Sequence, residues 1–218
     1  MLVLYVFSLY NNVCMLRVLP SPDYAPPVDE QLFKEVVDMA GPSLVTHPSH
    51  PEIFDKATTL FTETTELLNA SGSLGKVALC RLQIYSRTAG TNEPLGVTFH
   101  WHVDRTIMGL PEALVADQAP TAEVLAGDLE LPDELFSPDS SQREVCSWLY
   151  FEDNALTLAD SDLHIEQADP FVPMIQTDQT VHRSPHNKTL HPITRHLIIA
   201  GYAPQDSLHL DFGVTASR

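Results

Sequence analysis

Residues 76–104, KVALCRLQIYSRTAGTNEPLGVTFHWHVD, contain the pattern that decides the fold. The runs 76–87 and 96–104 are strand-like, because β-branched, aromatic and other apolar residues alternate in them with polar ones. Between the two runs, residues 89–94 (AGTNEP) are a cluster of turn-forming residues. We therefore expect the two runs to be antiparallel neighbours in a sheet.

Other parts of the chain add strands and two helices to this pattern. Further strand-like runs lie at 145–153, 180–185 and 195–204. Residues 29–40 and 51–70 have the apolar spacing of helices. The 218 residues suit a single domain. We expect an N-terminal strand and supporting helices over 1–75 and a strand-rich part over 76–205, which together make a mainly β domain with flanking helices.

Charge and cysteine content limit the partners and the compartment. The chain has 29 acidic residues against 12 Lys and Arg, a formal net charge of −17. It would repel a polyanion, so no nucleic-acid partner is expected. Cys14, Cys80 and Cys146 lie far apart without a C-x-x-C pair. The sequence therefore indicates neither a disulfide framework nor a zinc–thiolate site, and it favours a reducing, cytoplasmic setting.

The apolar N-terminus, residues 1–19, resembles a signal peptide only superficially. It lacks a basic segment before the apolar run and a small-residue cleavage site after it, and Asn11 and Asn12 interrupt it. A buried strand or a mis-assigned start is the simpler interpretation. Elsewhere the sequence has no run near the roughly 18 continuous apolar residues that a membrane span needs, so no membrane partner is expected.

An acidic segment, residues 111–144, stands out between the strand-like runs. Arg143 is its single basic residue, and its nine acidic residues are Glu112, Asp117, Glu123, Asp128, Glu130, Asp133, Glu134, Asp139 and Glu144. We interpret it as a solvated excursion from the sheet. It is either a polar surface loop with a short helix or a lid that closes over a substrate.

Two candidate metal ligands lie in the run 96–104. Side chains alternate along a strand, so His102 and Asp104 point to the same side. Their Cα atoms are separated by about 6 to 7 Å, a gap that an imidazole and a carboxylate can close around one metal ion. An H-x-D triplet alone arises often by chance.

His182 is the candidate for a third ligand, and Arg195 follows thirteen positions later at the head of an apolar strand. Two imidazoles and one carboxylate on one face of an octahedron leave the opposite positions open. That arrangement suits iron(II) enzymes that bind O₂ beside a chelating organic acid.

With these residues in order, the sequence resembles the Fe(II)/2-oxoglutarate-dependent dioxygenases and their H-x-D…H…R pattern. The resemblance runs from about Leu79 to Tyr202. It includes HWHVD, WLYFEDNALTL and QTVHRSPHNKTLHPITRHLIIAGY. It implies a double-stranded β-helix, or jelly-roll, core. The sequence departs from the family in having Asn154 and Ala155 where paired glycines are common.

The resemblance also implies residue roles. His102, Asp104 and His182 would hold iron(II), and Arg195 would bind the distal carboxylate of 2-oxoglutarate through its planar fork. Tyr85 would add a hydroxyl to the same carboxylate. With O₂ as oxidant, such an enzyme would hydroxylate or otherwise oxidise an unactivated C–H bond. The small size favours a small molecule as substrate, such as an amino acid or a natural-product intermediate.

Several alternatives stay open. The substrate would be a protein or peptide if the chain acts like a prolyl hydroxylase, with 111–144 as its docking surface. A cupin-like dioxygenase would use His100, His102 and His182 without 2-oxoglutarate. A non-catalytic β-helix module would only bind a ligand, and then Arg195 would form a structural ion pair. Outside these sets, Trp101 and Trp148 are expected in the core, and His186, His191 and His196 in loops or around the ligands.

Overall fold

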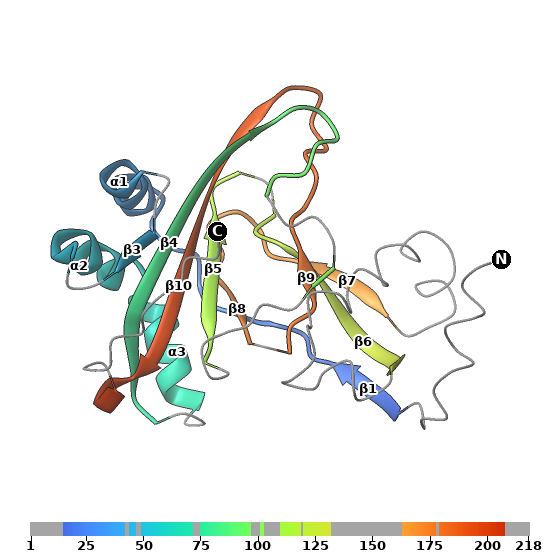
Figure 1. The fold of residues 1–218 in the computed structure, drawn as a ribbon, viewed down its shortest axis with the longest axis horizontal. Coiled ribbons are helices and arrows are strands. Elements are labelled where there is room, and N and C mark those ends of the chain that lie inside the picture. Colours follow the sequence, from blue (N-terminus) through green and yellow to red (C-terminus); the bar gives the residue numbers. More distant parts are fainter. Residues whose placement is uncertain are drawn as a thin grey trace.

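The computed structural model describes residues 15–41, 44–46, 49–71, 75–96, 101–102, 110–118, 120–131, 163–177 and 179–207. These residues form two antiparallel sheets, and helices cover one face of the larger sheet (Figure 1). The larger sheet has six strands in the order β2-β8-β5-β10-β4-β3, and the smaller sheet contains β1, β6, β7 and β9. The predicted mainly β class with flanking helices is confirmed, and two antiparallel sheets are what a jelly-roll core requires.

The larger sheet consists of β2 (Asp23–Tyr24), β3 (Leu44–Thr46), β4 (Val77–Ala89), β5 (Glu112–Ala116), β8 (Met174–Gln176) and β10 (Ile193–Pro204). The smaller sheet consists of β1 (Met15–Leu19), β6 (Glu123–Leu131), β7 (His164–Gln167) and β9 (His182–Arg183). The helices are α1 (Glu30–Ala40), α2 (Pro51–Leu60) and α3 (Thr62–Ser71), and a 3-10 turn, η4 (Gln205–Ser207), follows β10. The predicted strands 76–87 and 195–204 are confirmed as β4 and β10, whereas of the strand predicted over 180–185 only His182–Arg183 forms a strand, β9. The predicted strand 145–153 lies outside the described residues.

Local sequence signals explain where the helices begin and end. Asp29 caps α1, since its carboxylate accepts a hydrogen bond of 2.7 Å from the amide of Leu32. Gly41 ends α1 with a positive φ of 62°. The helix predicted over 51–70 is in fact two helices, because the chain leaves helical geometry at the buried Phe61. None of the described helices, of which α1 is the longest at 11 residues, has the length and apolar character of a membrane span.

Strand β10 lies in the middle of the larger sheet and separates two apolar clusters. It pairs with β4 along its whole length and with β5 over Leu197–Gly201. Its residues Ile198 and Ala200 face the helices, and Leu197 and Ile199 face the smaller sheet. The alternation predicted for residues 195–202 is therefore confirmed.

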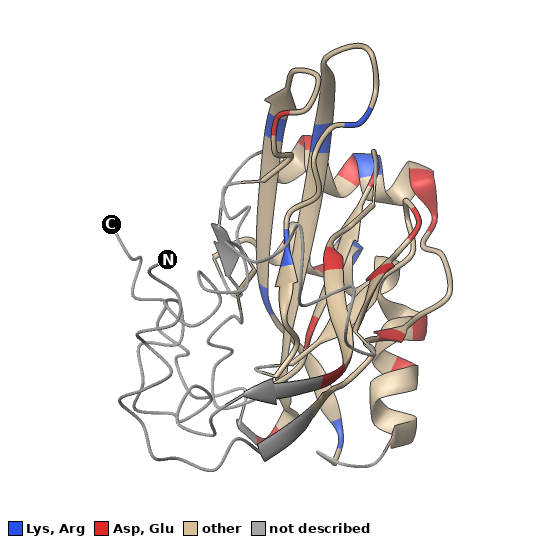
Figure 2. Cartoon of the chain, turned by 90° about the vertical axis from the view of Figure 1, so that its right-hand side faces the viewer, with Lys and Arg blue, Asp and Glu red and all other residues tan. Residues whose placement is uncertain are grey.

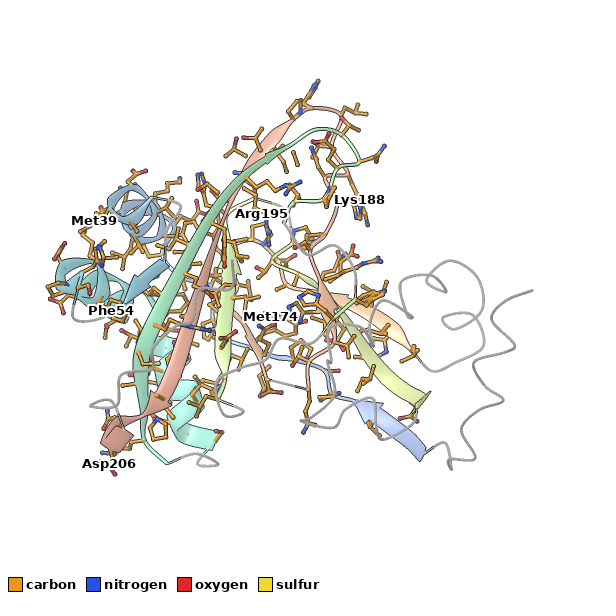
Figure 3. The ribbon with its side chains drawn as sticks, viewed as in Figure 1. Met39, Phe54, Met174, Lys188, Arg195 and Asp206 are labelled. Atoms are coloured by element: carbon orange, nitrogen blue, oxygen red, sulfur yellow. The ribbon has the colours of Figure 1, made fainter. Side chains whose placement is uncertain are left out.

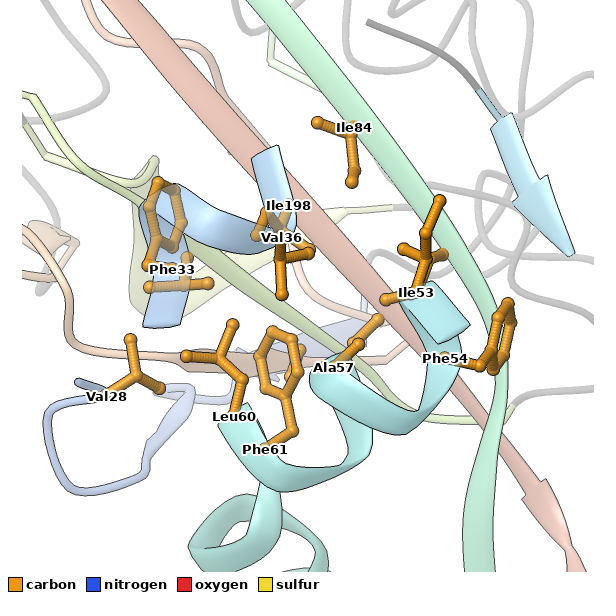
Figure 4. Close-up of a cluster of buried hydrophobic side chains, with 14 of the residues drawn as sticks. Val28, Phe33, Val36, Ile53, Phe54, Ala57, Leu60, Phe61, Ile84 and Ile198 are labelled. Atoms are coloured by element: carbon orange, nitrogen blue, oxygen red, sulfur yellow. The ribbon is translucent and has the colours of Figure 1, made fainter. Parts of the chain in front are cut away.

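The helix-side cluster is the main core of the domain (Figure 4). Phe33 and Val36 of α1 and Ile53 of α2 pack there against Ile84 and Ile198 of the sheet. The second cluster lies between the sheets and includes Leu114, Ala122, Val124, Ala168 and Met174, with Leu197 and Ile199 packed against it. The strands of the larger sheet thus contribute side chains to the helix-side core on one face and to the cluster between the sheets on the other.

The acidic segment 111–144 is not the solvated excursion that its composition suggests. Its residues 112–116 form β5, a buried strand of the larger sheet, and 123–131 form β6, to which the other three strands of the smaller sheet pair. Glu112 and Glu123 are buried because Arg81 and Arg183 pair with them. The interpretation as a surface loop is wrong for these strands, and residues 132–144 lie outside the described part.

The loop that precedes His102 has a different neighbour from the one expected. Gly90–Glu93 forms the predicted turn, in which the Glu93 carboxylate accepts a hydrogen bond of 2.7 Å from the amide of Gly90. The chain then runs beside residues 185–187, and the amide of Leu95 donates to the carbonyl of Pro185 at 2.8 Å. Strand β4 pairs with β10 and β3 instead. The expected pairing of 96–104 with 76–87 is not found among the described residues.

A carboxylate joins the two sheets at one edge. Glu166 of β7 accepts hydrogen bonds from Ser21 at 2.5 Å and from Tyr24 of β2 at 3.3 Å, and His164 lies 2.9 Å from the same carboxylate. Burial alone would raise the pKa of Glu166, but the hydrogen bonds from Ser21, His164 and Tyr24 outweigh it and lower the pKa.

Figure 2 shows the acidic positions on the helices and strands, with the fewer Lys and Arg positions among them.

Candidate metal and co-substrate site

Two of the three predicted metal ligands, His102 and His182, form a close pair. They lie opposite each other in an antiparallel bridge and exchange both backbone hydrogen bonds, at 2.9 and 2.8 Å. Their ring centroids are 4.3 Å apart, and both residues are buried, with 9% and 5% of their surface exposed. Residues directly opposite each other in such a pair project to the same side of the sheet. The structure thus brings together two histidines that are 80 positions apart in sequence.

The histidine pair points toward the space between the sheets. In the register of β9 with β6, His182 is opposite Val124. Val124 packs in the cluster between the sheets with Leu114 of β5 and Met174 of β8. Because cross-strand partners share a face, the imidazoles of His102 and His182 lie on this inner side.

A backbone carbonyl orients the ring of His182. Its Nδ1 lies 3.1 Å from the carbonyl oxygen of Thr180. A carbonyl only accepts, so this contact assigns the proton to Nδ1 and the lone pair to Nε2. Histidines that bind metals commonly donate their other ring nitrogen in this way, which fixes the tautomer and the ring orientation.

Asp104, the predicted carboxylate ligand, lies outside the described residues, as does His100. Within the described ranges, no group of three or more His, Cys, Asp and Glu residues is arranged to hold a metal ion. Two of the three predicted ligands, the histidines, therefore lie in the described residues, and the role of Asp104 stays a prediction from its place two residues after His102.

Arg195 of β10 is a buried cation on the inner face of the larger sheet (Figure 3). Only 2% of its surface is exposed. Its guanidinium donates to the carbonyl oxygens of Leu95, at 3.2 Å, and Thr121, while Nε has no hydrogen-bond partner. Burial lowers the pKa of Arg195 to about 10, against the opposing effect of Asp117. The guanidinium remains charged at neutral pH without a carboxylate bonded to it in the described part of the chain.

The other arginines with described side chains are placed differently. Arg81 forms a buried ion pair with Glu112, and Arg183 donates to Glu123 at 2.7 Å. Arg87 is exposed. Among these four, Arg195 combines burial with the lack of an acidic partner, a combination that is costly unless an anion completes it.

Two hydroxyl-bearing residues lie near Arg195. Tyr85 of β4 is opposite Leu197, so it shares the inner face with Arg195, and 42% of its surface is exposed. Thr121, which precedes β6, bonds to Arg195 through its carbonyl, and its buried Oγ1 has no hydrogen-bond partner. Sequence analysis missed Thr121, because nothing in the acidic segment marks it before the fold brings it to Arg195.

The neighbouring histidines have other surroundings. His196 points to the opposite face of β10 and lies 2.7 Å from the Asp117 carboxylate. His186 lies beside Pro94 in the loop after β9, and His191 is exposed. Asn187, fully buried in the same loop, donates to the carbonyls of Ala89 and His191 and so ties the loop to the end of β4. The expectation that these histidines lie in loops or around the ligands holds for His186 and His191, and it is wrong for His196, which lies within β10 on the face turned away from the histidine pair.

No protein-family model and no curated protein sequence matches the chain. Among solved structures, the chain is similar to HygX from Streptomyces hygroscopicus with iron bound, at 13% identity, with 93% of this chain and 85% of HygX covered and a TM-score of 0.46. It is also similar to the Kdo hydroxylase KdoO, a non-heme Fe(II) alphaketoglutarate-dependent dioxygenase solved with succinate and Fe(III), at 12% identity, with coverages of 84% and 78% and a TM-score of 0.45. For AviO1 from Streptomyces viridochromogenes the identity is 14%, the coverages are 69% and 61%, and the TM-score is 0.42. The chain thus spans 61% of AviO1, and it spans 32% of EvdMO1.

Proposed function

We propose that this chain is an iron(II)- and 2-oxoglutarate-dependent oxygenase that oxidises an unactivated C–H bond of a small molecule. One observation carries the proposal. A pair of buried imidazoles and a buried guanidinium without an acidic partner face the same space between two sheets. The first group suits a metal ion and the second suits an anion, and this enzyme class needs both.

The residues fit the metal. His102 and His182 offer two imidazoles already held on one side of adjacent strand segments. The contact of His182 Nδ1 with the Thr180 carbonyl leaves Nε2 as the atom that would bind the metal. Asp104 would supply the carboxylate. Two imidazoles and one carboxylate are the ligand set of iron(II) oxygenases.

The residues also fit the co-substrate. Arg195 would bind the distal carboxylate of 2-oxoglutarate, since its Nε is a buried donor without a partner. The Thr121 hydroxyl would donate to the same carboxylate, and Tyr85 lies on the same face of the sheet. When bound, this metal and co-substrate would supply, with O₂, the oxidation of a C–H bond coupled to conversion of 2-oxoglutarate into succinate and CO₂.

The apolar residues between the sheets would exclude water from this chemistry. Leu114, Met174, Leu197 and Ile199 come from three strands of the larger sheet, and Val124 faces them from β6. An apolar lining with a few convergent polar groups is typical of sites for small molecules. It supports a small-molecule substrate over a large protein.

The test is a co-substrate turnover assay on the iron-loaded protein, against a panel of amino acids and small organic acids. We expect consumption of 2-oxoglutarate with formation of succinate, and its loss in the His182→Ala variant. Metal-dependent oxidation without 2-oxoglutarate would favour the cupin-like alternative with His100. Metal binding without any turnover across the panel would favour a non-catalytic module.

A further inference from the structure

Next to the histidine pair, on the opposite side of the same strand segments, Trp101 and Arg183 face each other. The bridge between His102 and His182 fixes this, because in an antiparallel pair the residue before one partner is opposite the residue after the other. The guanidinium carbon of Arg183 lies 4.3 Å from the centroid of the Trp101 ring. At this distance a cation is attracted to the face of an indole, and more strongly when water is excluded. Trp101 is 1% exposed, so the contact is desolvated.

Glu123 of β6 binds the same guanidinium from the other side. The register places Glu123 opposite Arg183, just as it places Val124 opposite His182. Nε of Arg183 donates to Glu123 at 2.7 Å, and Gln167 of β7 donates to the second carboxylate oxygen at 2.9 Å. The side chains of Arg183 and Glu123 are 13% and 4% exposed. A continuous row, Trp101–Arg183–Glu123–Gln167, therefore crosses four adjacent strand segments on the outer face of the smaller sheet.

The outer row and the two histidines depend on the same strand pairings, that of β9 with the segment 101–102 and that of β9 with β6. A slip of one residue in either of these two pairings would turn a histidine to the outer face. It would also separate Arg183 from Trp101 or from Glu123 and leave a buried charge unpaired. Strand β9 is only two residues long, so few other ladder contacts resist such a slip. Lysine cannot replace arginine here without loss, since it has no planar group to stack on the indole while donating to a carboxylate.

We propose that Arg183 is a positioning residue for the metal site. Stacked on Trp101 and paired with Glu123, it holds β9 in register with the segment 101–102 and with β6, and so sets the separation of the His102 and His182 imidazoles. This inference rests on the proposed function, because a bound metal is what makes that separation matter.

The chain offers a matched control for the test. Arg81 and Glu112 also form a buried ion pair, and Gln176 donates to Glu112 at 3.2 Å, just as Gln167 donates to Glu123. This second triad lies in the larger sheet, away from β9. The variants Arg183→Met/Glu123→Gln and Arg81→Met/Glu112→Gln each remove a buried arginine–glutamate pair and keep an acceptor for the glutamine. They differ in that Glu123 also has the exposed Lys188 Nζ at 3.6 Å.

The experiment titrates the full chain with Co(II) as an oxygen-stable probe of the iron site and follows the visible Co(II) absorption, with thermal unfolding as the check of folding. The Arg183→Met/Glu123→Gln variant is expected to bind Co(II) about 10- to 100-fold more weakly and with an altered spectrum, as loss of an outer-shell partner typically does. The Arg81→Met/Glu112→Gln variant is expected to lose thermal stability but to keep the wild-type Co(II) affinity.

A third variant, Arg183→Lys, keeps the charge beside Glu123. It tests the positioning role of Arg183 if the double variant fails to fold. We expect it to weaken Co(II) binding by about 10-fold. Affinities within about 2-fold of wild type in the folded Arg183 variants, or equal weakening in the Arg81 control, would overturn the inference. A wild-type protein that binds no Co(II), or binds it equally after His182→Ala, would instead overturn the proposed function.

Discussion

His102 and His182 exchange both of their backbone hydrogen bonds and hold their ring centroids 4.3 Å apart. The strand pairing holds the two residues opposite each other. A metal would thus meet two of its ligands already ordered, and the entropy of ordering them is lost on folding rather than on binding.

The first prediction is that His102→Ala and His182→Ala each abolish stoichiometric iron binding. Each change leaves one imidazole, too few for a stable iron(II) site with one carboxylate. Metal content after anaerobic loading with Fe(II) and gel filtration is the measurement, and His191→Ala, at an exposed position, is the control. Full iron occupancy in either variant would show that the substituted histidine is not a metal ligand.

The second prediction separates the two possible ligand sets. Alternation puts both His100 and Asp104 on the face of His102, but the 2-oxoglutarate enzymes use a carboxylate beside the two histidines. Asp104→Ala should therefore abolish iron binding or turnover, whereas His100→Ala should keep both. The measurement is iron content together with 2-oxoglutarate consumption. The reverse pattern, with His100 essential and Asp104 dispensable, would favour the cupin-like alternative.

The third prediction concerns Arg195. Replacing it with methionine should raise the KM for 2-oxoglutarate by on the order of 10- to 100-fold, or about 1.4 to 2.8 kcal/mol, with iron affinity nearly unchanged. In the protein without ligand, relief of the buried charge favours the variant, and loss of the hydrogen bonds to the carbonyls of Leu95 and Thr121 opposes it. The change in KM is therefore the diagnostic result. Steady-state kinetics and thermal shifts with and without 2-oxoglutarate measure both effects.

An unchanged KM in a folded Arg195→Met variant would mean that another cation binds the distal carboxylate of 2-oxoglutarate. Arg87 would then be tested first, because Arg81 and Arg183 are already paired with glutamates.

The fourth prediction concerns the Thr121 hydroxyl. A buried hydroxyl without a partner costs about 1 to 3 kcal/mol, so the nearly isosteric Thr121→Val should leave the protein without ligand as stable as wild type or more so. If Oγ1 binds 2-oxoglutarate, the same change should raise the KM about 3- to 10-fold, as loss of one hydrogen bond would. Thr64→Val, at a buried position in α3, is the control. Lower stability with an unchanged KM would assign Thr121 a structural role.

The fifth prediction concerns the edge where Glu166 joins the sheets. Its pKa is lower in the folded chain than the ordinary 4.5, so its hydrogen bonds stabilise the fold above that pH and are lost as the pH falls through the folded value. Wild type should therefore exceed Glu166→Gln in stability at pH 7, and the difference should shrink below about pH 4.5. Denaturant midpoints between pH 7 and pH 3 measure this. A difference that does not change with pH would contradict it.

The sequence was sufficient for the elements whose signals are local. The strand patterns of β4 and β10, the helix α1 and the start of α2 at Pro51 all depend on neighbouring residues. The histidine pair could also be predicted, because H-x-D and the downstream histidine follow in the order of a known ligand set. In the structure, His102 and His182 lie opposite each other in a bridge, and their role as metal ligands stays a prediction.

Long-range pairing was beyond local pattern analysis. Glu112 and Glu123 made the acidic segment look solvated, yet the arginines that pair with them lie 31 and 60 positions away. Only the folded sheet order brings those charges together, and it turns the segment into β5 and β6. Thr121 was missed for the same reason, since its contact with Arg195 spans 74 positions.

The division of the larger sheet into a helix-supported face and an inner face has a consequence for the diversification of this scaffold. Mutations at Leu114, Met174 or Leu197 alter the lining between the sheets, while Phe33, Ile84 and Ile198 keep the helices in place on the other side. Substitutions more than about 7 to 10 Å apart that share no partner contribute nearly additively to stability. Substitutions at Leu114 or Met174 can therefore change the side chains that line the space between the sheets while the packing of the helices on the other face is retained.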